Sequence, residues 1–303
     1  MNEFYKTLDE LYLSGNLAAI ERFILEAVAE TSEAGPDRAG LYNELAGFYK
    51  GVSRYAESED MLKRALGIFE SAGMSTTVEY ATALVNLAGL YRLTGDADKA
   101  VELFINAMKR LEDADLRNSY AYVSAVNNLA LAYQAKGEFA RALEYANRAL
   151  EIVRASDGNE HEVASSLNNL AAIRLQIGEL DAANELISEA LEIYDGMTEP
   201  NVHHAAALAT KAVIMCRKGD LRGSLNGFQR ALELTRRFFG ENIEFAICRR
   251  NISEVNELLG DIPSAITELS EAIRIMVNIR GASHASVLDA RNKLAQLRGK
   301  LTT

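Results

Sequence analysis

Asparagine side chains recur along this 303-residue chain at intervals that place them in equivalent positions. They are Asn43, Asn86, Asn127, Asn128, Asn168, Asn169 and Asn251. A primary amide donates and accepts hydrogen bonds at the same time. A row of such amides can therefore hold the N–H and C=O groups of an extended peptide backbone.

The residue types that catalysis and metal binding need are scarce. The adjacent His203 and His204 cannot act as a pair, because neighbouring residues on a helix do not face one another. Cys216 and Cys248, the only two cysteines, cannot form a disulfide scaffold or a four-ligand zinc site by themselves. No Gly-rich phosphate loop, His-Glu-x-x-His motif or nucleophile elbow occurs. The sequence predicts no catalytic residue, no metal site and no cofactor.

A tight-turn residue divides the chain into equivalent units. The spacings are 42, 42, 41, 41 and 41 residues between Ser53, Gly95, Gly137, Gly178, Gly219 and Gly260. Three columns of small residues keep register with this turn. Alanine stands twelve residues after it, and alanine or serine stands five residues after it and seven before it. Six copies of three columns predict a repeated structural unit.

Each unit has the pattern of two helices joined at the turn. Apolar residues stand at helical spacing before the turn, as at Leu84, Leu87 and Tyr91. Glycine readily adopts the left-handed conformation that ends a helix, and an acidic residue directly after it suits the N-terminus of the next helix. Small residues let the two helices approach closely. Because one hairpin cannot bury its apolar face alone, we expect the hairpins to stack.

These patterns resemble the tetratricopeptide repeat. Residues 84–91 read L-x₂-L-A-x₂-Y and residues 100–107 read A-x₃-F-x₂-A, close to the family pattern but without its Trp and terminal Pro. The period and the Asn-Asn-Leu-Ala strings at 127–130 and 168–171 resemble the longer repeats of kinesin light chains. The resemblance implies an all-α, right-handed solenoid whose first helices line a concave groove.

We expect a single solenoid domain over residues 1–303, made of about seven hairpins and a C-terminal capping helix at 284–300. The hairpins are expected at 2–34, 38–73, 77–115, 119–156, 160–197, 201–239 and 242–280. Atypical units at both ends are usual in solenoids, because a terminal unit has a neighbour on one side alone.

The resemblance also implies which residues face the groove. In the family, the inner face is formed by positions 13, 10, 9, 6, 3 and 2 before the turn residue. In this sequence these positions hold the asparagines named above. They also hold three arginines, Arg92, Arg217 and Arg250, and nearer to the N-terminus Lys50. We expect the amides to contact a peptide and the cations to receive its acidic groups. The alternatives are amides that bond to the adjacent repeat and cations that are solvated or paired within the chain.

Two cations interrupt otherwise apolar columns. Lys211 stands where other copies have leucine. Arg249 stands eleven residues before its turn, a position that holds the apolar Leu84 in another copy. Long cationic side chains can lay their stems over apolar surface. One interpretation is a loosened junction between two hairpins, and the other is a basic spot that binds a partner.

The charge balance narrows the range of partners. The chain has 32 basic and 43 acidic residues, for a formal net charge of −11 at pH 7. Phosphate neutralisation supplies most sequence-independent affinity for nucleic acid, so we expect no nucleic-acid partner. No apolar stretch approaches the roughly 20 residues that span a bilayer, and the first residues show no signal-peptide pattern. We therefore expect a cytoplasmic protein with no membrane partner.

Three hypotheses of function remain. The favoured one is a non-enzymatic scaffold that binds a peptide segment of a partner protein of unknown identity in the concave groove. The second is a self-assembly module that uses its caps or convex face. A monomer or a weak homodimer is expected. An unrecognised hydrolase is the least favoured hypothesis.

Overall fold

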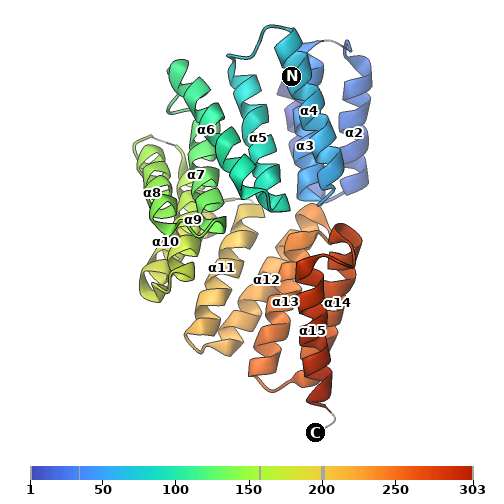
Figure 1. Cartoon of the computed structure of the whole chain (residues 1–303), viewed down its shortest axis with the longest axis vertical. Helices are drawn as coiled ribbons and strands as arrows, with labels where there is room; N and C mark the ends of the chain where they lie inside the picture. Colours follow the sequence, from blue (N-terminus) through green and yellow to red (C-terminus); the bar gives the residue numbers. More distant parts are fainter. Residues whose placement is uncertain (1, 34, 157, 199–201, 302–303) are drawn as a thin grey trace. The chain divides into compact units, whose positions relative to one another are not determined.

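The computed structural model describes residues 2–33, 35–156, 158–198 and 202–301 (Figure 1). These residues form fifteen α-helices and no strand. In chain order the helices are α1 (Asn2–Ser14), α2 (Leu17–Glu30), α3 (Pro36–Gly51), α4 (Tyr55–Ser71), α5 (Val78–Thr94), α6 (Ala97–Asp113), α7 (Tyr120–Ala135), α8 (Phe139–Arg154), α9 (Glu160–Gln176), α10 (Leu180–Gly196), α11 (Val202–Arg217), α12 (Leu221–Phe239), α13 (Ile243–Leu258), α14 (Ile262–Arg280) and α15 (Ala285–Gly299). The predicted all-α repeat fold is confirmed.

The helices fall into two compact units, Met1–Glu179 and Leu180–Thr303. We call them unit 1, which holds α1 to α9, and unit 2, which holds α10 to α15. Within each unit every helix packs against the next one along the chain, as Figure 1 shows. The single domain expected over residues 1–303 stays a prediction.

The turn inside the hairpins has the predicted left-handed backbone. The turn residues have positive φ in all six copies, including Ser53 at 63° and Gly95 at 96°. The next helix then begins under an acidic cap in several copies. The Asp96 carboxylate accepts a hydrogen bond from the backbone N–H of Lys99 at 3.2 Å, and Asp220 does the same for Gly223 at 2.9 Å. These caps satisfy N–H groups that a helix N-terminus leaves without partners.

The small-residue columns mark the place where the two helices of a hairpin touch. The residues seven before and five after the turn are buried in all six copies. Where a serine occupies one of these columns, its hydroxyl donates to the carbonyl of the residue opposite. Ser58 bonds to the carbonyl of Ala46 at 2.8 Å, and Ser253 bonds to that of Ala265 at 2.7 Å. In these hairpins the two columns therefore face each other.

The first helices of neighbouring hairpins also contact one another. In unit 1, α3 contacts α5, α5 contacts α7 and α7 contacts α9, and in unit 2 α11 contacts α13. Among the described residues, no pair of second helices packs to a comparable extent. We call the side of unit 1 that these first helices form its inner face.

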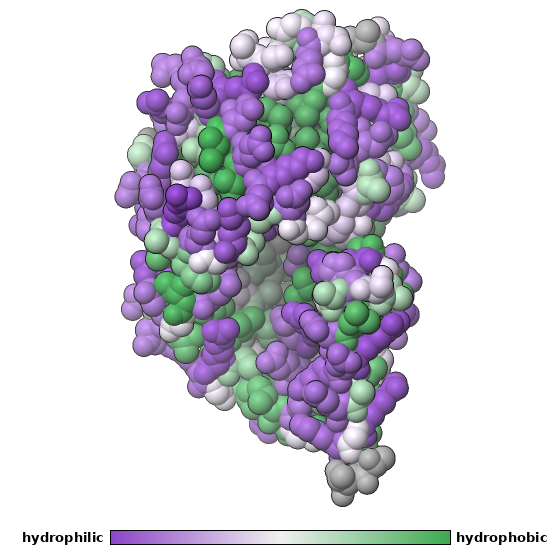
Figure 2. Space-filling view, viewed as in Figure 1, coloured by the Kyte–Doolittle hydropathy of each residue, from purple (hydrophilic) through white to green (hydrophobic). Residues whose placement is uncertain are grey.

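Hydrophilic side chains cover most of the face that Figure 2 shows, and hydrophobic ones gather in separate patches. At the end of unit 2, α15 covers α14 with Leu297 and Ala290, both buried. Lys293 and Lys300 hold this helix to Glu257 of α13, at 2.7 and 2.8 Å. The expected capping helix is thus present and attached by both packing and charge.

Replacement of Ala142 by leucine tests the close approach of the helices. Ala142 is fully buried at 0% exposure and lies in the column five after its turn, opposite Ala130. We expect Ala142→Leu to lower the free energy of unfolding by about 1–3 kcal/mol, because extra methylenes overpack a filled contact. Urea denaturation followed by circular dichroism measures this change.

Ala142→Ser is the matched control. The structure already accommodates serine in this column at Ser58 and Ser224, where the hydroxyl reaches the opposite carbonyl. We expect this variant to stay within about 1 kcal/mol of the wild type. Equal stabilities for the leucine and serine variants would contradict the proposed close contact.

Candidate peptide-binding groove

The inner face of unit 1 carries a polar stripe on α3, α5, α7 and α9. Two of its columns lie nine and ten residues before the turn and hold six of the seven predicted asparagines. Asn127 is buried, and the other five are half-buried. The repeat places these side chains on the same face of successive helices, because each first helix keeps the same register to its turn.

The amides nearest to the N-terminus pair with each other. The Asn86 side-chain nitrogen donates to the side-chain oxygen of Asn43 at 2.9 Å, and the Lys50 ammonium donates to the oxygen of Asn86 at 3.4 Å. These bonds join α3 to α5. Farther along, the Asn127 amide donates to the Ser166 hydroxyl at 2.8 Å and joins α7 to α9. For Asn43, Asn86 and Asn127 the geometry favours the structural alternative, and peptide contact stays a prediction.

The amides on α7 and α9 keep more of their hydrogen-bonding capacity. Asn128 donates to the carbonyl of Ser124 in its own helix at 2.9 Å, and its side-chain oxygen has no partner among the described residues. Asn169 forms no hydrogen bond with any described residue. The Asn168 side-chain oxygen is buried and also lacks a partner within the described chain. Unpaired amide groups therefore gather where α7 and α9 meet.

Two cations occupy one column at the other end of the stripe. Lys50 on α3 and Arg92 on α5 both stand three residues before their turns, and both are half-buried. Burial first, and then the positive charge of Arg92, lower the pKa of Lys50 to about 8. Two like charges held close together in a half-buried place favour the binding of an anion.

Closer to the N-terminus, burial and then the negative charge of Asp9 raise the pKa of Glu44.

Unit 2 carries its own smaller set. Arg250 and Asn251 lie next to each other on α13, and Arg217 lies on α11, which contacts α13. Both arginines are exposed and Asn251 is half-buried. The amide of Asn251 forms no hydrogen bond with the described residues. These three residues lie on two helices that contact each other, and their ligand-binding role stays a prediction.

The two cations that interrupt apolar columns are paired within unit 2. The Lys211 ammonium donates to the side-chain oxygens of Asn184 and Ser188 on α10, both at 2.8 Å. Arg249 forms an ion pair with Glu268 on α14 at 2.6 Å. Hydrogen bonds therefore replace apolar contacts at these places, and they link each first helix to a neighbouring second helix.

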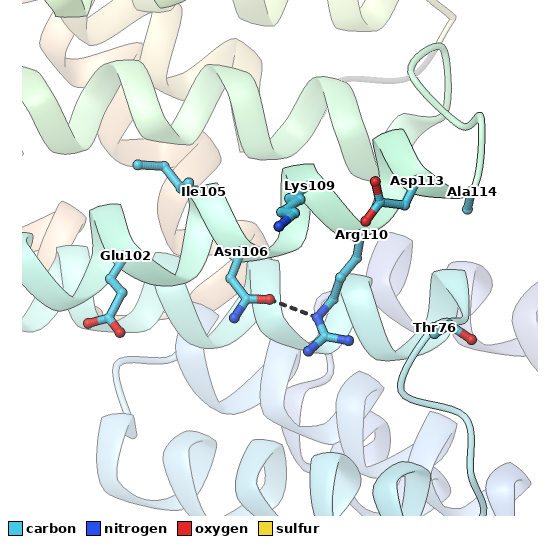
Figure 3. Close-up of a pocket in the computed structure, with 8 residues that line it drawn as sticks. All are labelled: Thr76, Glu102, Ile105, Asn106, Lys109, Arg110, Asp113 and Ala114. Atoms are coloured by element: carbon cyan, nitrogen blue, oxygen red, sulfur yellow. Dashed lines mark hydrogen bonds between the residues drawn. The ribbon is translucent and has the colours of Figure 1, made fainter.

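A hollow of about 740 Å³ lies on α6 and the loop before α5, where no sequence pattern predicts a site (Figure 3). Arg110 donates to the side-chain oxygen of Asn106 at 2.7 Å and also reaches the carbonyl of Ser75. The remaining lining residues mix both charge signs with the exposed Ile105. Nothing in this mixture selects one ligand chemistry.

The described residues show no candidate metal site. They contain no group of three His, Cys, Asp or Glu side chains that could hold a metal ion. Burial raises the pKa of Cys248 to about 12, and its thiol donates to the carbonyl of Phe228 at 3.2 Å. Such a thiol is a poor nucleophile. In the part of the chain that the structure describes, no helix is both long and apolar enough to cross a bilayer.

Solved structures with the same fold include two that were determined as complexes. NprR, in complex with its cognate peptide NprX, is 13% identical and aligns over 100% of this chain and 87% of its own, with a TM-score of 0.67. A Rap protein complexed with competence and sporulation factor is 13% identical over 98% of this chain and 100% of its own, with a TM-score of 0.60. BtubC from P. vanneervenii is 23% identical over 77% of this chain and 92% of its own, with a TM-score of 0.52. At these identities the likeness shows the fold alone.

Comparison with curated protein sequences finds no match. The sequence model of the tetratricopeptide repeat matches residues 37–113 and 122–195. These segments run from α3 to α10 and contain four of the six turns with their small-residue columns, as well as the polar stripe described above. Together with the helical hairpins, this match shows that the chain belongs to the tetratricopeptide repeat family.

Proposed function

We propose that the chain is a non-enzymatic interaction module that binds an extended peptide segment of a partner protein along the first helices of unit 1. The observation that carries this proposal is a pair of amides with hydrogen-bonding groups that no described residue uses, Asn128 and Asn169, in the same column of neighbouring first helices. Each can donate to a peptide carbonyl or accept from a peptide N–H. The same fold in NprR, solved with a peptide, supports the proposal.

The free energies of hydrogen bonding and association show that the two amides need further contacts to bind a peptide tightly. Each neutral hydrogen bond contributes about 0.5–1.5 kcal/mol net, whereas association costs an estimated 4–15 kcal/mol. Two amides therefore orient a peptide without binding it tightly. Charge at Lys50 and Arg92 is the clearest additional source of affinity in unit 1, because an acidic ligand group would relieve their mutual repulsion.

Alanine substitution of two different amide pairs separates binding from structure. A ligand is first selected from a displayed peptide library, and its affinity is measured by fluorescence anisotropy. We expect Asn128→Ala with Asn169→Ala to weaken binding about 5- to 100-fold, because two hydrogen bonds to the ligand are lost. The thermal unfolding midpoint should change little, since these amides form no bond between helices.

Asn43→Ala with Asn86→Ala is the matched control pair. It removes the bond of 2.9 Å between α3 and α5. We expect this pair to lower the unfolding midpoint while retaining most of the affinity. If the control pair weakens binding and the Asn128–Asn169 pair does not, the assignment of the two ends of the stripe is wrong.

Lys50 should make stability depend on pH in the alkaline range. Its pKa is about 8 in the folded chain and 10.5 for an ordinary lysine, so the folded state binds this proton less tightly than the unfolded state. The charged side chain therefore destabilises the fold below pH 8, and the penalty disappears as the pH rises to 10.5. We expect Lys50→Met to raise the free energy of unfolding at pH 7 by about 1–2 kcal/mol, with the gain shrinking toward pH 10.

Urea denaturation at neutral and alkaline pH measures this difference. Lys109→Met, at an exposed lysine of α6, controls for loss of a surface charge. A gain that is the same at both pH values, or equally large for the control, would contradict the lowered pKa of Lys50.

A further inference from the structure

One helix of unit 2 is basic although the chain is acidic. α12 carries four arginines and one glutamate, all exposed. They are Arg222, Arg230, Glu233, Arg236 and Arg237. The formal net charge of the whole chain is −11.

The last turns of α12 form one wall of a groove with α13. The groove has a volume of about 430 Å³ and is lined by Gln229, Leu232, Glu233, Arg236, Arg237, Phe245 and Arg249. Five of these residues recur at the spacing of one helix face on α12, and Phe245 and Arg249 lie one turn apart on α13. We call it the arginine groove. α12 and α13 pack against each other, as Figure 1 shows.

The floor of the arginine groove is apolar and its cations are held at the sides. Phe245 is buried at 1% exposure, and the guanidinium of Arg249 lies 5.1 Å from the centre of its ring. Arg237 lies over Phe238 in the same way, at 5.6 Å. Stacked guanidinium groups keep their edges available for hydrogen bonds to carboxylates.

Two of the three arginines have donors to offer. Arg236 is exposed and forms no hydrogen bond or ion pair with any described residue. Arg249 uses one terminal nitrogen for Glu268, at 2.6 Å, while its Nε is buried with no acceptor among the described residues. A buried donor without an acceptor costs free energy, which an incoming acceptor would recover.

The acidic residues near the arginine groove are mostly engaged already. Glu268 pairs with Arg249, and Glu241 pairs with Arg274 at 2.6 Å. Arg274 first, and then Arg236 and Arg249 through space, hold the pKa of Glu241 below its usual value. Glu233 is the one acidic residue among those that line the groove. The groove is therefore a positive site with an apolar floor.

We propose that the arginine groove binds an acidic segment of a partner protein, with a carboxylate between Arg236 and Arg249 and a neighbouring apolar side chain on Phe245. Its volume fits a few side chains rather than a length of nucleic-acid backbone. The net charge of −11 also opposes a long polyanion. The site lies on α12 and α13, so it is independent of the peptide stripe on unit 1.

Binding of a synthetic acidic peptide tests the proposal. The probe is a fluorescein-labelled peptide in which glutamates alternate with phenylalanine and leucine, and its counterpart has glutamine in place of every glutamate. We expect the acidic peptide to bind wild type at least about tenfold more tightly than the glutamine peptide, with an affinity that falls as NaCl is raised. We expect Arg236→Gln with Arg237→Gln to remove at least about tenfold of that affinity.

Arg222→Gln with Arg230→Gln is the matched control, because it removes the same charge from exposed positions of the same helix outside the groove. It should retain the wild-type affinity within about twofold. The single variant Arg236→Gln, at a side chain without a structural bond, keeps the test valid if the double variant unfolds.

If the two double arginine variants lose affinity for the acidic peptide equally, the attraction comes from the general positive charge of α12 and the proposal is overturned. So would equal affinities for the glutamate and glutamine peptides, or an oligothymidylate that binds more tightly than the acidic peptide. Loss of affinity in Lys50→Met alone would place the acidic ligand on unit 1. The proposed peptide stripe can therefore fail or succeed separately from the arginine groove.

Discussion

The close approach of two helices at a pair of small residues is the constraint on which the rest of this protein depends. Ser58 and Ala46 show it directly, since a side-chain hydroxyl spans the gap to the opposite backbone. A contact this tight fixes how one helix of a hairpin is rotated against the other. The small-residue columns are buried in all six copies, and each first helix keeps the same register to its turn.

That register explains why the inner face of unit 1 is divided in its chemistry. The same columns reach the inner face in each copy, but the residue types differ from copy to copy. Between α3 and α5 two amides face each other and form a bond. On α9 the equivalent position holds Asn169, which has no partner among the described residues. The fold therefore uses one part of the stripe to hold itself together and leaves another part open.

The repeats, turns and small columns could be predicted because backbone geometry dictates them residue by residue. A left-handed turn restricts the residue at Gly95, and a close helix contact restricts the residue at Ala88. The partners of polar side chains could not be predicted in the same way. The Asn127 amide donates to the hydroxyl of Ser166 on the neighbouring helix, and no sequence column includes Ser166. Arg249 was visible as an interruption, but Phe245 below it and Glu268 beside it became evident only in the packed structure.

The spacing between successive first helices also determines how many residues of an extended ligand correspond to one hairpin. Packed helices lie about 8–10 Å apart, and an extended peptide advances about 3.3 Å per residue. One hairpin therefore corresponds to about three residues of the ligand. Successive side chains of an extended peptide point in opposite directions, so amides one hairpin apart address alternate sides of its backbone. In the proposed complex, Asn128 and Asn169 would therefore contact ligand residues about three positions apart. One residue inserted between those two ligand positions would prevent both contacts from forming at once.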